Sequence, residues 1–526
     1  MELSMAKIPS VMSHSFSQVP KAEIPRSSFD RSSGRKTTFN SGYLVPVFCD
    51  EVLPGDTYNL TATFFARLAT PLHPVMDNMR LTSFFFFVPF RLLWDNWQRF
   101  MGEQDNPGDS IDYLVPQMLA PAGGYAAGTI YDYFALPTQV AAYSHWSFPF
   151  RAYNLIYNEW FRDQNLQNSV TVLKGDTNDP PATYTLLRRG KRHDYFTSCL
   201  PWPQKGPGVD IPLGTSAPVR SDAPVGGAIG VLNTGGGIAL MDTAGANLTM
   251  TATSGAGGVL YADLTQATAA TINQLRQAFQ IQKLYERDAR GGTRYTEIIR
   301  AHFNVVSPDA RLQRPEYLGG GQSPINLYSV PQTSATDAQP TPQGNLAAYG
   351  TVSGSNHGFT HSFTEHGIII GLVSVQADLN YQQGLERFWS RRTKFDFYWP
   401  ALSHIGEQAV LNKEIFTQGT ANGDGRDIQD EQVFGYQERY AEYRYKPSTI
   451  TGEFRSNFAQ SLDTWHLAQD YASLPALNAN FIEDHPPIPR VIAVVNEPEF
   501  IMDSFMRLRC ARPMPVYGVP GMIDHF

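Results

Sequence analysis

The histidines near residue 360 are the first residues whose types and spacing suggest chemistry. Potential metal ligands lie close together here, namely His357, His361, Glu365 and His366, and histidine with glutamate is a common donor set for zinc. A helical zinc motif needs His-Glu-x-x-His, which this stretch lacks. Alternation instead places His357, His361 and Glu365 on one face of an extended chain, and the apolar run 368–375 follows. We therefore predict a β-strand here, with no metal or other cofactor.

A second concentration of chemistry is a dense basic cluster formed by Arg188, Arg189, Lys191 and Arg192. Aromatic residues follow it, namely Tyr195, Phe196 and Trp202. Guanidinium groups neutralise phosphates and aromatic rings stack on bases, so the combination suits single-stranded nucleic acid. Salt bridges between subunits explain the same residues equally well. Arg444 and Lys446, in the Tyr-rich stretch 436–446, are further candidate DNA contacts, although interface packing is the simpler interpretation there.

No catalytic constellation is recognisable. The sequence has no Gly-x-Ser-x-Gly elbow and no Walker loop. Cys49, Cys199 and Cys510 are widely separated, which argues against a disulfide framework and fits a reducing compartment such as a bacterial cytoplasm. The acidic stretch 419–431 lacks EF-hand spacing, so calcium is only a weak alternative. Because neither an apolar signal segment nor a membrane-length apolar run is seen, we expect neither secretion nor membrane insertion.

The composition favours a protein that packs against copies of itself. Of 526 residues, 42% are hydrophobic, 12% are aromatic and only 17% are charged, against about 25% charged in ordinary soluble domains. The net charge of −8 argues against bulk nucleic-acid binding and leaves only local basic patches. A secreted β-rich enzyme, such as a carbohydrate-active sandwich, is the alternative function. The missing signal segment and the unpaired cysteines count against that alternative.

The stretch around the Phe84 to Phe87 run is expected to form the scaffold that positions any functional site. Strand patterns cover 57–68 and 79–88, and a helical pattern over 92–101 follows. The four consecutive phenylalanines show no polar alternation, so both faces of that strand should be covered, by a second layer or by a neighbouring subunit. The expected core comprises Phe64, Phe84, Phe85, Phe86 and Trp97.

Periodicity predicts most of the remaining elements. Helical spacing of apolar residues predicts helices over 148–164, 264–286 and 463–474. Apolar or alternating runs predict strands over 368–378, 393–399, 489–495 and 500–508. The Gly-, Pro- and Gln-rich stretch 316–356 predicts a long irregular loop.

Two segments differ in composition from the rest. Residues 1–40 are polar and basic without periodicity, which predicts an extended N-terminal arm and not a packed element. Residues 203–265 are Gly-rich and contain a single aromatic residue, Tyr261, so they cannot build a large core. We predict a surface-projecting insertion with short strands near 237–241 and 246–253.

Several long motifs resemble the major capsid protein of the gokushoviruses, a subfamily of the Microviridae. They include Phe39-Asn-Ser-Gly-Tyr-Leu-Val-Pro46, Cys49-Asp-Glu-Val-Leu-Pro-Gly-Asp56 and Phe84-Phe-Phe-Phe-Val-Pro-Phe-Arg-Leu-Leu-Trp94. Further matches are Glu286-Arg-Asp-Ala-Arg-Gly-Gly-Thr-Arg-Tyr-Thr-Glu297 and the C-terminal Arg512-Pro-Met-Pro-Val-Tyr-Gly-Val-Pro-Gly-Met-Ile-Asp-His-Phe526. The resemblance extends from about Phe39 to Phe526 and is specific, because each motif is long and unusual.

The resemblance implies a mainly β fold, an eight-stranded antiparallel jelly roll with long loops formed by 41–202 and 266–526. It implies a T=1 virion shell of sixty copies around circular single-stranded DNA, with no enzymatic activity. Its implied partners are a small basic DNA-binding peptide, an internal scaffolding protein, a minor pilot protein and a host surface receptor. The insertion 203–265 would form a threefold protrusion for host attachment, with candidate residues Gly226, Gly236, Thr243, Asn247 and Thr253.

Overall fold

The computed structural model describes residues 25–206, 272–333, 343–419 and 429–518. Between 207 and 271 it describes only the backbone of five short strands. The chain divides into two compact units, one formed by Met1–Pro203 with Val305–Phe526 and the other by Gln204–Asn304.

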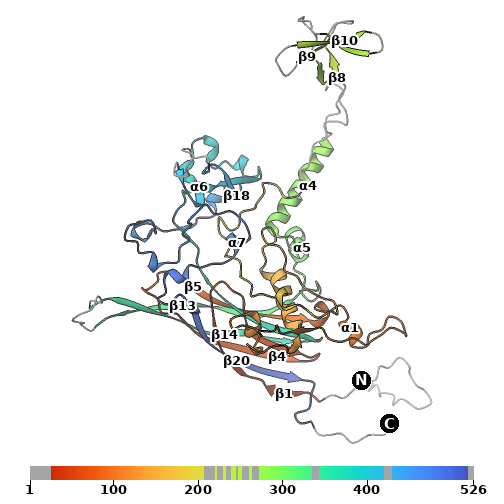
Figure 1. Ribbon diagram of the computed structural model, residues 1–526, viewed down its shortest axis with the longest axis vertical. Coiled ribbons are helices and arrows are strands. Elements are labelled where there is room, and N and C mark those ends of the chain that lie inside the picture. Colours follow the sequence, from red (N-terminus) through yellow and green to blue (C-terminus); the bar gives the residue numbers. More distant parts are fainter. Residues whose placement is uncertain are drawn as a thin grey trace, which may run out of the picture. The chain divides into compact units, whose positions relative to one another are not determined.

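The first unit is built on one curled antiparallel sheet (Figure 1). Its strands are β1 (Ser27–Asp30), β2 (Ser33–Phe39), β3 (Val45–Val52), β4 (Thr57–Leu68), β5 (Met79–Pro89), β13 (Glu316–Pro331), β14 (Leu346–Ser362), β15 (Gly367–Ala377) and β20 (Phe500–Arg512). The order is β1-β20-β4-β14-β13-β5-β15-β3, and β2 also pairs with β20. β1 and β2 pair with successive parts of β20, so they occupy one position and the sheet has eight strand positions.

This order is that of a jelly roll. The sheet folds into two halves of four positions, β2-β20-β4-β14 and β13-β5-β15-β3, and each half combines strands from distant parts of the chain. The β13–β14 hairpin joins the halves, and its pairing register is interrupted between Gly320 and Asn326. The predicted antiparallel jelly roll, an architecture common in viral capsids, is confirmed.

Alternation along the strands explains how the two halves close on one core. In β4 every second residue from Tyr58 to Leu68 is buried, and in β20 the same holds from Phe500 to Cys510. The apolar residues among them join one cluster with Phe85 and Phe87 of β5. The predicted strands at 57–68, 79–88, 368–378 and 500–508 are thus present.

The phenylalanine run is covered on both faces, as predicted. Phe85 and Phe87 point into the core between the sheet halves. Phe86 is buried in a second cluster, and Phe84 packs against that cluster half-buried. Of the expected core residues, Phe64, Phe85 and Phe86 are buried, whereas Phe84 and Trp97 are only partly covered. The cover is a second layer from the same chain, so no neighbouring subunit is needed for it.

The second layer comes from residues 90–187 and is rich in aromatic side chains. Its elements are η1 (Phe90–Leu92), α1 (Trp97–Phe100), β6 (Gln117–Leu119), α2 (Ile130–Tyr133), β7 (Ser144–Trp146), α3 (Phe148–Ile156), the π-helical turn η2 (Tyr157–Phe161) and η3 (Pro181–Thr183). The predicted helix over 148–164 is therefore shorter, and that over 92–101 is reduced to two short turns. Arg151 and Asp179 form a fully buried ion pair in this layer, with Nη2 to Oδ1 at 2.6 Å.

A third cluster lies in the long connection between β15 and β20, to which residues 195–199 also contribute. Its regular elements are β16 (Asn380–Tyr381), η5 (Arg387–Ser390), η6 (Lys394–Asp396), η7 (Pro400–Leu402), β17 (Glu407–Leu411), α6 (Asn412–Ile415), β18 (Val433–Glu438), η9 (Ala441–Tyr443), β19 (Ser448–Thr449), η10 (Gly452–Phe454), η11 (Asp463–Trp465), α7 (Ala479–Ile482) and η12 (Ile488–Arg490). The predicted strands over 393–399 and 489–495 and the helix over 463–474 are wrong. These stretches are mostly irregular chain with single 3-10 turns, because tertiary contacts outweigh their local preference.

The expectation that 1–40 does not pack is wrong for residues 27–39. β1 and β2 pair with β20, and Phe39 stacks on Phe500 with ring centroids 5.4 Å apart. The sequence does not indicate the strand β2, because one face of β2 is open to solvent and carries polar residues. Residues 1–24 lie outside the described residues.

The expectation of an irregular loop over 316–356 is also wrong, since this stretch forms β13 and the start of β14. The glycines within these strands occupy positions where neighbours approach closely. A Cβ at Gly321 would lie 2.7 Å from Cγ of His357, and one at Gly320 would lie 2.1 Å from the Ser83 carbonyl oxygen. Glycine inside a strand therefore reflects close packing here and does not mark a loop.

The second unit contains small antiparallel strands and two helices. Its elements are β8 (Val219–Ser221), β9 (Ile229–Leu232), β10 (Ile238–Ala244), β11 (Asn247–Thr251), β12 (Leu260–Ala262), α4 (Ile272–Gly291) and α5 (Tyr295–Phe303). β9, β10 and β11 form one sheet and β8 pairs with β12. The short strands predicted near 237–241 and 246–253 correspond to β10 and β11, and α4 to the predicted helix over 264–286. Among the described residues, no helix has both the length and the apolarity needed to cross a membrane.

Candidate assembly and nucleic-acid interfaces

The most unusual surface feature is an aromatic loop, residues 388–399, in the connection between β15 and β20. Six large aromatic side chains in it are exposed, namely Phe388, Trp389, Phe395, Phe397, Tyr398 and Trp399. Trp389 is 69% exposed and Phe397 is 51% exposed. Such rings are normally buried, so a cluster of exposed ones marks an interaction site.

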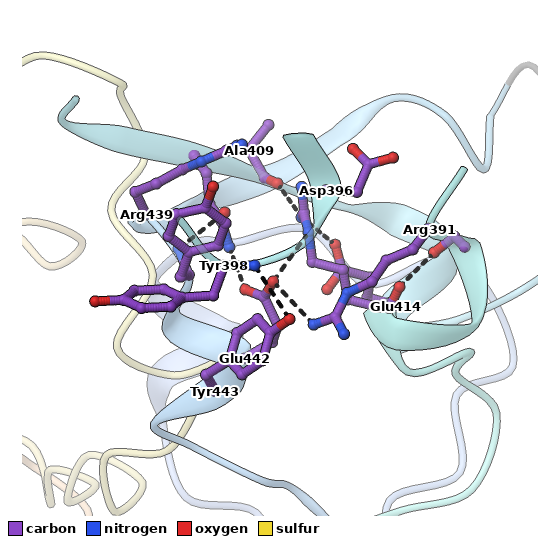
Figure 2. A network of polar contacts seen from close by, with 12 residues as sticks. Arg391, Asp396, Tyr398, Ala409, Glu414, Arg439, Glu442 and Tyr443 are labelled. Atoms are coloured by element: carbon purple, nitrogen blue, oxygen red, sulfur yellow. Dashed lines mark hydrogen bonds and ion pairs between the residues drawn. The ribbon is translucent and has the colours of Figure 1, made fainter. Parts of the chain in front are cut away.

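Buried ion pairs anchor this loop at its base (Figure 2). Arg387 donates to the Glu414 carboxylate at 2.9 Å and to the Ala409 carbonyl at 2.6 Å. Glu442 accepts from the Gln408 side-chain amide at 2.6 Å and lies 3.5 Å from the Arg391 guanidinium. Burial raises the pKa of Glu414, and the Arg387 charge opposes that rise.

Stacking and hydrogen bonds fix the part of the loop from Arg391 to Tyr398. The Arg391 guanidinium lies over the Tyr443 ring at 4.4 Å, and Tyr398 packs edge-on against Tyr440 at 5.3 Å between ring centroids. The Tyr398 backbone N–H donates to the Tyr443 hydroxyl, and Arg439 donates to the Phe395 carbonyl at 2.9 Å (Figure 2). The exposed rings are therefore held in place before any partner arrives, which lowers the entropy lost on binding.

The chemistry of this surface suits a protein partner. Aromatic residues and arginine are enriched in protein interfaces and dominate their binding energy. An adjacent cleft of about 530 Å³ contains both signs of charge, with Arg387, Arg391, Arg392 and Lys413 facing Asp396, Glu414 and Glu431. Because three acidic side chains offset most of the four positive charges, the cleft has no strong preference for a polyanion.

Two residues of the predicted basic cluster serve the fold. Arg188 stacks on the Tyr43 ring at 3.9 Å and donates to the Asp484 carbonyl at 2.9 Å. Gly42 allows this approach, because a Cβ there would lie 2.1 Å from the same carbonyl oxygen. Lys191 is buried over the Phe481 ring, and burial lowers the pKa of Lys191 to about 8.

The other two residues of the cluster face a pocket. Arg192 is half-exposed and its Nη1 lies 3.0 Å from the Asp378 carboxylate. Arg189 lies over the Phe84 ring at 4.9 Å, and burial lowers its pKa to about 10. The structure therefore does not bring the four basic residues onto one open surface.

Arg444 and Lys446 are exposed but have acidic neighbours. Arg444 pairs with Glu438, and Lys446 lies 3.6 Å from Glu386. Their role as DNA contacts stays a prediction. Of the candidate attachment residues, Thr243 lies on β10 and Asn247 on β11, whereas Gly226, Gly236 and Thr253 lie outside the described residues.

The predicted strand at the histidines is confirmed. His357 lies in β14 and is buried, with Nδ1 2.7 Å from Ser83 Oγ and Nε2 2.8 Å from Ser323 Oγ. Burial lowers the pKa of His357. Across the described ranges, no group of three or more His, Cys, Asp or Glu side chains is arranged to hold a metal ion.

The sequence reasoning missed a second exposed surface, the open sheet face, formed by the outward residues of β2, β20 and β4. Arg507 and Arg509 of β20 and Arg67 of β4 are exposed there, beside the exposed rings of Phe65 and Phe505. Asp503 on this face pairs with Lys36 at 3.0 Å. The alternation Met506-Arg507-Leu508-Arg509 indicates this surface in the sequence, because alternating apolar and basic residues place a row of cations on one face of a strand.

Comparison with known proteins decides the family. Residues 17–522 match the family described as "Capsid protein (F protein)". The chain belongs to this capsid protein family of the Microviridae phages. It is 51% identical to "Capsid protein VP1" of Bdellovibrio phage phiMH2K over 98% of both chains. It is 46% identical to the protein of that name from Chlamydia phage 1, over 98% of this chain and 99% of the relative.

A more distant relative extends the same grouping. "Capsid protein VP1" of Spiroplasma virus 4 is 38% identical over 97% of both chains. The resemblance to gokushovirus major capsid proteins is confirmed, and the chain is a structural component of a virion. The alternative of a secreted β-rich enzyme gains no support from these relatives.

Proposed function

We propose that the chain assembles with itself into a T=1 shell of sixty copies that encloses circular single-stranded DNA, in the cytoplasm of a bacterial host. The aromatic loop is the observation that supports self-assembly most strongly. A monomer in water gains nothing from exposing Trp389, Phe395 and Phe397, whereas burying them against another copy removes apolar surface from water.

The open sheet face supports the nucleic-acid part of the proposal. It combines unpaired arginines with exposed rings, the chemistry that binds single strands through phosphate neutralisation and stacking. Arg67, Arg507 and Arg509 form no ion pair with any described residue. Two exposed acids lie near them: Asp503 is paired with Lys36, and Asp30 of β1, opposite Arg509, offsets only part of the positive charge. These residues are better candidates for DNA contact than the buried Lys191.

The remaining partners follow from charge and composition. A chain with a net charge of −8 cannot neutralise an enclosed genome by itself, so we propose a small basic DNA-binding peptide as a partner. An internal scaffolding protein and a minor pilot protein complete the assembly. We propose that residues 203–265 form the threefold protrusion and contact the host receptor, because their aromatic-poor composition suits an exposed projection.

Two substitutions with matched exposure test self-assembly. Phe397 in the aromatic loop and Phe505 on the open sheet face are both 51% exposed, so Phe397→Ala and Phe505→Ala remove the same side chain from equally accessible sites. Phe397→Ala should abolish or strongly reduce shells measured by sedimentation and electron microscopy. Phe505→Ala should leave shell formation intact and lower the DNA content of the shells. Equal shell yields for Phe397→Ala and the unmodified chain would refute the assembly role of the loop.

A further inference from the structure

A small basic pocket lies on the outward side of the second half of the sheet. It has a volume of about 230 Å³, and its lining includes Arg80 of β5, Gln322 of β13 and Gln376 of β15. Arg189, Arg192 and Asp378 complete the charged part of the lining. The sheet holds three of these side chains on rigid neighbouring strands, which keeps the pocket preformed.

The charge of this pocket is positive and only partly compensated. Three arginines face it, and Asp378 is the single acid in its lining. That carboxylate is shared, with Arg80 at 3.3 Å and Arg192 at 3.0 Å. Asp378 therefore positions these two guanidinium groups and leaves Arg189 without a carboxylate partner in the pocket.

Arg189 has unused hydrogen-bonding capacity. Its Nη1 is buried, and no described residue accepts a hydrogen bond from it. A buried donor without an acceptor is unfavourable and rare in native proteins. The Asp484 carboxylate attracts the Arg189 guanidinium electrostatically, but the two form no ion pair among the described contacts. An anion bound in the pocket would offset the Arg189 charge, which no carboxylate of the lining pairs with.

We propose that this pocket binds a phosphate group. Three guanidinium groups provide the planar forked donors that match phosphate oxygens, and Gln322 provides a neutral donor beside them. The pocket volume exceeds the roughly 30 Å³ share of one water several-fold, so a tetrahedral anion fits. The phosphate comes either from the solution or from a nucleic-acid backbone, and only the second source rests on the proposed enclosure of DNA.

Binding to unassembled full-length chains tests the proposal independently of shell formation. Titration calorimetry with inorganic phosphate is compared for the unmodified chain, Arg189→Gln and Arg192→Gln. Loss of one charged hydrogen-bond donor should weaken binding roughly 10- to 100-fold. Arg300→Gln is the control, because Arg300 is exposed at the end of α5 in the other unit, and it should bind phosphate like the unmodified chain.

A gain-of-function variant guards against misfolding of the arginine variants. Asp378→Asn removes the only acid of the lining and should strengthen phosphate binding several-fold. A thymidine oligonucleotide then identifies the source. If Arg189→Gln weakens the binding of both ligands, the pocket binds backbone phosphates. If it weakens only the binding of inorganic phosphate, the pocket binds the free anion. Equal phosphate affinities for the unmodified chain, Arg189→Gln and Asp378→Asn, or no phosphate binding at all, would overturn the proposal.

Discussion

Replacing Asp179 with asparagine should strongly destabilise the second layer, which covers the outward face of the Phe84–Phe87 strand. The Asp179 carboxylate accepts from Arg151 Nε at 2.9 Å and from Nη2 at 2.6 Å, and the Tyr184 hydroxyl donates to it at 2.6 Å. Both members of the ion pair have fully buried side chains. In the variant, the Arg151 charge would remain in an apolar layer with only neutral acceptors, namely the Leu93 and Gly175 carbonyls and the asparagine amide oxygen.

The expected size of the effect follows from this burial. Removing one partner of a buried ion pair destabilises a protein by about 3–5 kcal/mol, because the other charge stays uncompensated. Solvent does not screen this pair, since neither side chain has exposed surface. A typical domain is stable by only about 5–15 kcal/mol, so a loss of this size should also reduce particle yield.

Urea unfolding of Asp179→Asn and the unmodified chain measures the loss. The double variant Arg151→Met with Asp179→Leu is the decisive comparison, because replacing both charges by apolar groups removes the uncompensated charge. It should be destabilised less than Asp179→Asn alone. A loss below about 1 kcal/mol for Asp179→Asn, or a double variant less stable than the single one, would contradict the electrostatic argument.

Three further predictions follow. Burial lowers the pKa of His357. Below the unfolded-state pKa of about 6.5, the unfolded chain therefore takes up a proton that the folded chain does not. The thermal unfolding midpoint should fall as the pH drops from 7.5 to 5.5, and it should fall less steeply in His357→Gln. Gly321→Val should lower the midpoint because its Cβ would meet His357, whereas Gly108→Val, with no neighbour within 4 Å, should not. Glu442→Gln should release the aromatic loop from its anchor. Proteolysis within 388–399 should then be faster and fewer shells should form. Unchanged cleavage would argue against the anchoring role.

The local sequence pattern was sufficient to predict a strand where apolar and polar side chains alternate along it. The strand around Phe64 and the closing strand at Phe500 were predictable, because burial of every second residue requires an apolar-polar alternation. Pattern failed where a strand is built from small residues. In β13, Gly320 and Gly321 are needed because Ser83 and His357 approach closely, and no local rule distinguishes such glycines from those of a loop.

The candidate sites divide in the same way. The sequence showed that Arg188 to Arg192 concentrate charge, but burial among Phe481, Tyr43 and Asp484 assigns two of these residues to the fold. Residues 393–399 of the aromatic loop were predicted as a strand, because their residue types have high β-propensity. Its exposure depends on buried partners more than 40 positions away in the chain, such as Glu442 for Arg391.

The amino-acid sequence by itself determined the β class, the apolar strands, the foreign composition of 203–265 and the capsid family, because these depend on local alternation and on long specific motifs. Only the tertiary structure decided which charged and aromatic residues remain available to partners. Exposure, ion pairing and an unsatisfied donor such as that of Arg189 arise when distant segments meet. The four-phenylalanine run shows both levels, since its apolarity required cover on two faces and the fold supplied both covers from the same chain.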